Sequence, residues 1–132
     1  MIDDSVVATA KASYDRCCAV PAFFQAFYTT FFEACPEAKP LFARTNFERQ
    51  NRLLRHAIGL LLIFPRQPEG EPTLLTRIAE RHREIGIEPR LYAPFVDSLM
   101  ATVRRYDPEC TPAVERAWRD TVGMGVAYLC GH

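Results

Sequence analysis

Apolar residues recur along this chain at the three- and four-residue spacing that is typical of amphipathic α-helices. Ten prolines divide the sequence, and the long stretches between them carry that spacing. Because proline is tolerated at a helix start but breaks a helix interior, these stretches are natural helices. The pattern predicts helices over residues 3–18, 20–34, 47–64, 73–86, 90–106 and 112–130, and a short helical turn over 36–42.

The ends of some helices are marked by local signals. Gly86 can adopt the left-handed conformation that closes a helix, and Thr111 followed by Pro112 can cap the next start. Pro94 falls inside the helix expected from residue 90 and is expected to kink that helix or to shift its start. The proline-rich sequence of residues 65–72 predicts an exposed connector. Strands are not expected, because β-branched residues rarely alternate with polar ones. The chain is therefore predicted to be one all-α domain over residues 1–132.

Three polar side chains fall on apolar helix faces. Tyr28 lies within a stripe of phenylalanines, Gln50 shares a side with Leu54, and His82 lies among leucines and isoleucines. Burying any of them without a hydrogen-bond partner would cost about 1–3 kcal/mol. Each alone is most simply a hydrogen-bonded core group. Together they are explained if the domain encloses a ligand that needs one metal-binding imidazole and two neutral hydrogen-bond donors.

Composition excludes several classes of protein. Hydrophobic residues make up 48% and charged residues 24%, as in ordinary soluble domains. Sixteen basic and sixteen acidic residues balance, which argues against a nucleic-acid partner. The longest apolar run, residues 57–64, is far shorter than the roughly 20 residues that span a membrane. No secretion signal opens the chain, so a cytoplasmic protein without a membrane partner is expected.

The few histidines and cysteines narrow the chemistry further. Five cysteines form no C-x-x-C pair, which argues against a disulfide framework, a zinc knuckle and covalent c-type haem attachment. His56 lies off the apolar stripe and is expected to face solvent, and His132 is the last residue. His82 therefore has no second ligand spaced to complete a zinc site. A single inward histidine suits haem iron, because the porphyrin supplies four nitrogens.

An ordered set of motifs runs from about Ser5 to Leu129. It comprises Phe27-Tyr28-x-x-Phe31-Phe32, Pro36 followed by Leu41-Phe42, Gln50-x-x-x-Leu54, Ile78-Ala79-x-x-His82, Ile87-x-Pro89-x-x-Tyr92 and Ala117-Trp118. In this order and spacing the chain resembles a bacterial single-domain globin, of the type also found as the haem domain of flavohaemoglobins. The resemblance implies a globin fold of about six to seven helices around a pocket for non-covalent haem b and its iron.

The resemblance also implies a role for each pocket residue. His82 is expected to be the proximal iron ligand, with its Nδ1–H held by an acceptor. Tyr28, Gln50 and Leu54 are expected to form the distal pocket, where Tyr28 and Gln50 donate to a bound gas. If Gln50 turns outward, Tyr28 is the sole distal donor. Arg81 is either a partner for a haem propionate or a solvated surface arginine. The implied haem contacts are Tyr28, Phe42, Gln50, Leu54, Ile78, Arg81, His82, Ile87, Tyr92 and Phe95.

Tyr92 follows His82 by ten residues, as does a tyrosine in flavohaemoglobin-type globins. There the tyrosine shares a proximal network with a glutamate near the end of the last helix. Counted from Trp118, the matching glutamate falls just past the end of this chain, so the network is expected to be incomplete. This argues against peroxidase-like activation. No flavin or nicotinamide domain follows, so catalytic turnover is expected to need an external reductase.

Three functions stay open at the level of sequence. The first is reversible binding of O₂, and of NO and CO, at iron held by His82. The second is nitric oxide dioxygenation, in which O₂ held beside Tyr28 reacts with NO to give nitrate and an external reductase restores ferrous iron. The third is a gas or redox sensor that acts in trans on a partner. Reversible gas binding and nitric oxide dioxygenation are distinguished by a measurement of catalytic turnover and not by the sequence.

Overall fold

The computed structural model describes residues 2–66 and 73–131, and this part of the chain holds helices and no strand. The prediction of an all-α chain is confirmed, and every predicted helix has a counterpart. Of the predicted connector, residues 67–72 lie outside the described residues. The α-helices are α1 (Asp4–Cys18), α2 (Phe23–Ala34), α3 (Phe47–Ile63), α4 (Thr73–Glu84), α5 (Tyr92–Tyr106) and α6 (Pro112–Gly131), and the short 3-10 helices are η1 (Pro36–Phe42), η2 (Phe64–Arg66) and η3 (Pro89–Leu91).

Side-chain caps mark the starts of α3 and α6. The Asn46 side chain accepts a hydrogen bond from the backbone N–H of Arg49 at 3.2 Å and so caps α3. The Thr111 hydroxyl accepts one from the backbone N–H of Val114, also at 3.2 Å, and Pro112 is the first residue of α6. Both caps satisfy N–H groups that have no partner within the helix. The predicted cap at Thr111 is confirmed.

Gly86 closes α4, as predicted. Its φ is +82°, in the left-handed region that favours glycine. The N–H of Ile87 donates to the carbonyl of His82 at 2.8 Å, and the N–H of Gly86 donates to that of Arg83 at 3.1 Å. These two bonds are the closing pair of a Schellman motif. The regular helix ends at Glu84 rather than at residue 86, because residues 85 and 86 form the closing turn.

Two helices begin later than the periodicity indicates. α2 begins at Phe23 rather than residue 20, because the chain first makes tight turns in which Val20 bonds to Cys17 and Phe23 bonds to Val20. α5 begins at Tyr92 rather than residue 90. Pro94 is its third residue, where a backbone N–H would have no partner within the helix in any case. The proline therefore shifts the start of α5, which is one of the two expected effects.

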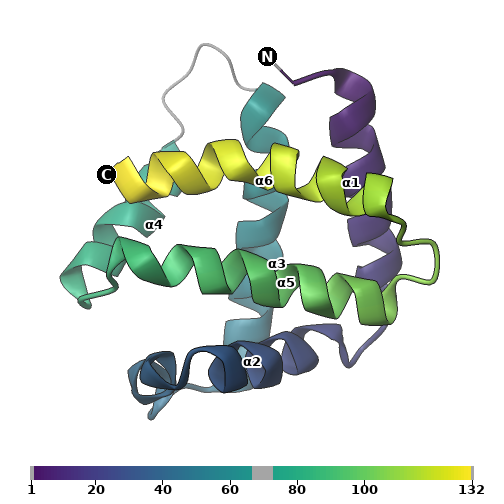
Figure 1. Ribbon diagram of the computed structural model, residues 1–132. Helices are drawn as coiled ribbons and strands as arrows, with labels where there is room; N and C mark the ends of the chain where they lie inside the picture. The colour runs from purple at the N-terminus through teal and green to yellow at the C-terminus, as the bar shows by residue number, and fades with distance from the viewer. Residues whose placement is uncertain (1, 67–72, 132) are drawn as a thin grey trace.

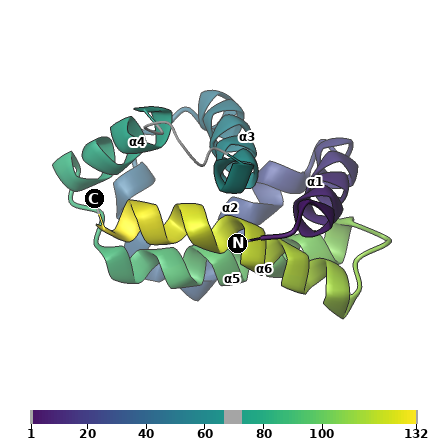
Figure 2. The same ribbon diagram turned by 90° about the horizontal axis from the view of Figure 1, so that it is seen from above.

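The helices cross in layers. α5 and α6 run side by side in opposite directions, and α3 crosses behind them (Figure 1). Seen from above, α3 and α4 lie on the far side of α5 and α6, with α1 at one end (Figure 2). Trp118 of α6 is fully buried and meets the ring of Tyr14 of α1 edge-on, with 5.8 Å between centroids. None of the helices in residues 2–66 and 73–131 has the length and apolar character needed to cross a membrane.

One glycine brings α3 and α6 together. A Cβ built on Gly125 of α6 would lie only 2.6 Å from Cδ2 of Leu61 of α3. Real Cβ atoms do not approach a neighbour so closely, so the absence of a side chain at Gly125 leaves room for the Leu61 side chain in its observed position. A Cβ built on Gly123, two residues earlier in α6, would have no neighbouring atom within 4 Å.

A buried carboxylate joins α1 to the end of α5. Asp107 is 2% exposed, and its two oxygens accept from Ser13 Oγ and Arg16 Nε, each at 2.6 Å. Burial raises the pKa of Asp107, but the hydrogen bonds from Arg16 and Ser13 lower it more, so the pKa lies below its usual value. The sequence pattern did not indicate this contact.

Candidate functional site

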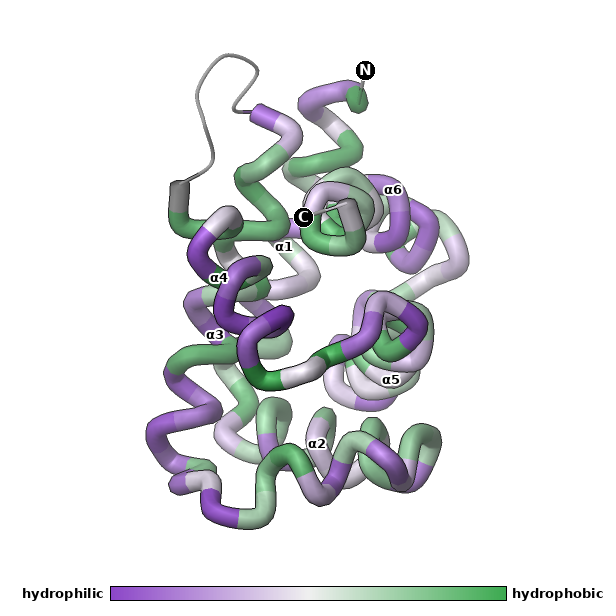
Figure 3. The backbone as a smooth tube through the Cα atoms, turned by 90° about the vertical axis from the view of Figure 1, so that its left-hand side faces the viewer, coloured by the Kyte–Doolittle hydropathy of each residue, from purple (hydrophilic) through white to green (hydrophobic). Residues whose placement is uncertain are grey.

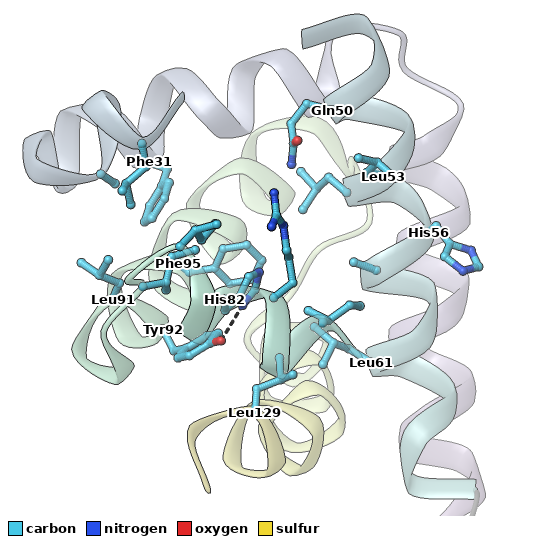
Figure 4. A pocket seen from close by; sticks show the side chains of 18 of the residues that line it. Phe31, Gln50, Leu53, His56, Leu61, His82, Leu91, Tyr92, Phe95 and Leu129 are labelled. Atoms are coloured by element: carbon cyan, nitrogen blue, oxygen red, sulfur yellow. Dashed lines mark hydrogen bonds between the residues drawn. The ribbon is translucent and has the colours of Figure 1, made fainter. Parts of the chain in front are cut away.

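A cavity of about 820 Å³ opens between α2, α3, α4 and the start of α5 (Figure 4). Its volume lies within the range of about 300–1,000 Å³ that small-molecule and cofactor sites occupy. The ten residues that the sequence assigned to a haem site all line it: Tyr28, Phe42, Gln50, Leu54, Ile78, Arg81, His82, Ile87, Tyr92 and Phe95. Six separate segments of sequence are thus brought to one place.

His82 of α4 and Tyr92 of α5 form one side of the cavity. His82 Nδ1 lies 2.6 Å from the Tyr92 hydroxyl oxygen (Figure 4). Burial lowers the pKa of His82, so the neutral imidazole predominates at neutral pH. In the tautomer whose Nδ1–H donates to Tyr92, the lone pair of Nε2 can bind a metal. In that tautomer, the acceptor of the Nδ1–H is the Tyr92 hydroxyl oxygen.

Tyr28 of α2 and Gln50 of α3 supply polar groups from the other helices. Gln50 Nε2 donates to the Tyr28 hydroxyl oxygen at 3.0 Å, and Gln50 points into the cavity (Figure 4). Burial raises the pKa of Tyr28 to about 12, although the bond from Gln50 opposes the shift, so the phenol keeps its proton. Because the amide donates to the phenol oxygen, the Tyr28 hydrogen stays available for another acceptor.

Four phenylalanines pack against the ring of Tyr28. Its centroid lies 5.2 Å from that of Phe27, 5.9 Å from that of Phe32, 5.5 Å from that of Phe42 and 5.4 Å from that of Phe47. Phe42 comes from η1 and Phe47 from the start of α3. Rings packed at such distances are favourable beyond the area that they bury. The direction of the Tyr28 hydroxyl is thereby set by contacts on two sides.

Arginines border the cavity. Arg81 lines it from α4, and its guanidinium lies 3.4 Å from a Glu84 carboxylate oxygen. Both side chains are exposed, and such ion pairs contribute under about 1 kcal/mol. Arg49 of α3 and Arg77 of α4 also line the cavity. The sequence pattern missed these two, although Arg49 directly precedes Gln50.

Some side chains lie elsewhere than their helical position indicates. His56 is exposed and points away from the cavity, as predicted (Figure 4). Leu74 and Ile85 are two of the leucines and isoleucines whose spacing places them on the same side as His82. They are nevertheless 46% and 43% exposed, because they border the open cavity. Val126 and Leu129 of α6 line the cavity and were not predicted, although their spacing of three residues places both on one helical face.

The chemistry of the cavity fits an iron porphyrin. Within residues 2–66 and 73–131, no three His, Cys, Asp or Glu side chains are grouped so that they could hold a metal ion. All five cysteines are free. An ion held by His82 alone would take its other ligands from a bound group such as a porphyrin. The apolar lining suits a flat macrocycle, and the arginines at its border suit carboxylates.

Comparisons with known proteins agree with this fold. The family model for globins matches residues 25–128. A flavohemoprotein of Rhizobium meliloti is 28% identical over 113 residues, which are 83% of this chain but 28% of that protein. A flavohemoprotein of Vibrio cholerae is 32% identical over 101 residues, which are 74% of this chain and 26% of that protein. The chain thus spans about a quarter of the length of these curated relatives.

A solved structure covers the chain more fully. The crystal structure of a Pseudomonas aeruginosa PAO1 protein, described as structurally highly homologous to a human hemoglobin, superposes with a TM-score of 0.89. It is 32% identical and the match covers 96% of each chain. The predicted globin fold is confirmed.

Proposed function

Because the chain belongs to the globin family, we propose that it binds haem b through His82 and reversibly binds O₂, NO and CO at the iron. One observation carries this proposal: two polar pairs, His82 with Tyr92 and Gln50 with Tyr28, meet in one largely apolar cavity. One pair offers a neutral ring nitrogen and the other a neutral O–H donor.

On the proximal side, Tyr92 sets the state of His82. Haem supplies the iron and an open coordination position for a diatomic gas. The Tyr92 oxygen accepts the Nδ1–H of His82, which fixes the ring and makes Nε2 a better donor. Burial, together with the nearby Cys130, raises the pKa of Tyr92 to about 12, so this acceptor is a neutral phenol. Among the described residues Tyr92 has no hydrogen bond to a carboxylate, which supports gas binding over O–O bond activation.

On the distal side, Tyr28 is the principal donor. Its proton is not used by Gln50, which itself donates to the phenol oxygen. A gas ligand that carries partial negative charge can accept this proton in an apolar pocket, where such a bond is stronger than in water. A hydrogen bond to a charged acceptor contributes about 1–3 kcal/mol, equivalent to about 5- to 150-fold in a rate of release.

Arginines complete the proposed site. Arg81 exchanges its exposed partner Glu84 for a haem propionate at little cost, since exposed ion pairs are weak. Arg49 and Arg77, which also line the cavity, are the other cations within reach of its border. A planar guanidinium pairs well with a carboxylate in this role.

The test of the cofactor is a titration with haemin, followed by absorption spectra of the ferric, ferrous and oxygenated forms. We expect one equivalent of haemin to give a Soret band in the wild type and in His56→Ala, which removes an exposed histidine of α3. His82→Ala should lose tight axial ligation. An unchanged spectrum in His82→Ala would refute the assignment.

The test of the distal side is the rate of O₂ release. Tyr28→Phe should release O₂ about 10- to 100-fold faster, because it removes the donor and keeps the ring. Gln50→Leu should have a smaller effect, and the double variant should behave like Tyr28→Phe. If only Gln50→Leu changes the rate, the two roles are the reverse of those proposed.

Nitric oxide dioxygenation is the second candidate function. The Tyr28 donor serves it equally, and the flavohemoprotein relatives, of which this chain matches about a quarter, suggest an external reductase. Steady nitrate production from NO, O₂ and NADH with an added flavin reductase would establish it. A single turnover followed by accumulation of the ferric form leaves gas binding as the function.

A further inference from the structure

Arginines gather on the outer side of α3 and the segment before it. Between residues 44 and 55 the chain has four arginines, Arg44, Arg49, Arg52 and Arg55, and one acidic residue, Glu48. All four arginines are exposed. Glu48 lies 3.9 Å from Arg52, whereas the other three arginines have no ion pair among the described residues. Twelve residues thus carry four positive charges and one negative charge in a chain whose formal net charge is zero.

This basic stretch reaches the mouth of the cavity. Arg49 lines the cavity, and so does Leu53, one turn further along α3. Leu53 is 51% exposed, and Leu41 of η1, which also lines the cavity, is 41% exposed. The tube coloured by hydropathy shows hydrophilic stretches of α3 and α4 on the same side of the molecule (Figure 3). Apolar side chains bordered by charged ones are the usual anatomy of a protein interface.

The cofactor alone does not account for this charge. Haem b carries two propionates, which neutralise at most two cations. Arg77 and Arg81 line the cavity from α4, in addition to Arg49. Arg44, Arg52 and Arg55 do not line it, so their charge faces solvent. An exposed field of one sign beside a cleft raises the association rate of a partner of opposite sign.

We propose that the basic face formed by Arg44, Arg49 and Arg52 beside Leu53 docks an acidic protein that donates single electrons to the haem. The inference rests on the proposed function, since iron that has become ferric must be reduced before it can bind O₂ again. One electron leaves the reduced donor and converts ferric to ferrous iron, and no atom is transferred. The cavity mouth is where such a donor comes near the cofactor, and its negative surface matches the arginines there.

The probe is a small acidic [2Fe–2S] ferredoxin. Its oxidised form, labelled with a fluorophore, is titrated with the purified protein, before and after haemin loading, at about 10 mM and about 500 mM ionic strength. The second measurement is the rate at which the reduced ferredoxin converts the ferric to the ferrous spectrum. Photoreduced lumiflavin, an uncharged donor, reports whether the haem itself stays reducible.

Arg44→Glu/Arg52→Glu reverses charge at two positions that do not line the cavity. We expect this variant to weaken ferredoxin binding and to slow reduction by at least about 10-fold at low salt, with the difference vanishing at high salt. Reduction by lumiflavin should not change. Arg44→Lys/Arg52→Lys should behave like the wild type. The matched control, Lys11→Glu/Arg116→Glu, makes the same change of charge at exposed positions of α1 and α6 and should alter both measurements by less than about twofold.

Several outcomes overturn the docking inference. Equal loss in both charge-reversal variants would mean that only net charge matters. Wild-type binding that is independent of salt, or tight binding to vesicles of anionic lipid without binding to ferredoxin, would also overturn it. If the haem-loaded protein neither binds ferredoxin nor is reduced by it, the docking inference alone is refuted. If the protein takes up no haemin, the proposed function and the docking inference are refuted together.

Discussion

The crossing of α3 and α6 at Gly125 gives a prediction that links the fold to the cavity. Alanine in a helix interior is favoured over glycine by about 0.5–1 kcal/mol. At Gly123 an added Cβ meets no atom within 4 Å, so Gly123→Ala should realise that gain. At Gly125 the Cβ would lie 2.6 Å from Leu61 Cδ2. Leu61 is 3% exposed, so its methyl group can move only against the surrounding core or into the cavity that the side chain also lines.

The size of the penalty follows from that overlap. Inserting a methyl group into a well-packed core costs about 1–3 kcal/mol. Gly125→Ala should therefore be less stable than Gly123→Ala by about 1–3 kcal/mol, although both substitutions are the same. Because Leu61 also lines the cavity, its displacement should weaken haemin uptake in Gly125→Ala only. Leu61→Ala removes the clashing methyl group. Leu61→Ala should therefore lower the free energy of unfolding by less in the Gly125→Ala background than in the wild type.

Urea denaturation of the haem-free protein measures these differences. The midpoints should order as Gly123→Ala, wild type and Gly125→Ala, with equal slopes. In thermal melts the two variants should differ by about 3–6 °C per kcal/mol for a chain of this size. Haemin titration supplies the second measurement. Equal stabilisation by both alanines would refute the argument, because it would show that the Leu61 side chain or the helix α3 can move at no cost.

Further predictions concern three other places in the molecule. Asp107→Asn should destabilise the protein by about 1–3 kcal/mol at pH 7 in urea denaturation. Because the folded pKa of Asp107 is lowered from 3.8, its contribution is present above that pH and lost as pH falls through the folded pKa, so the variant should differ least from wild type in acid. Tyr92→Phe should weaken haem retention about 10- to 100-fold in a haem-transfer assay, because His82 loses its acceptor; unchanged retention would contradict that role. Among the thiols, exposed Cys130 should react with a disulfide reagent within minutes, whereas Cys17, which is fully buried and whose pKa is raised to about 12 mainly by burial, should react only on unfolding.

The sequence by itself determined where the helices lie and which side chains face inward. Gly86 ends α4 because a left-handed residue is needed there, and Thr111 starts α6 because its hydroxyl caps a free N–H. Tyr28, Gln50 and His82 were placed on inner faces from helical periodicity alone. These features depend on residues within one or two turns, so they can be predicted without knowledge of the rest of the chain.

The tertiary structure decided which inward groups meet. Gln50 and Tyr28 are 22 residues apart, and their bond exists only because α2 and α3 cross at that point. The same holds for the close approach of Leu61 to Gly125, and for the two residues of α6 that reach the cavity. Periodicity gives the face of a helix, whereas the angle and distance at which two helices cross depend on how all their side chains pack together.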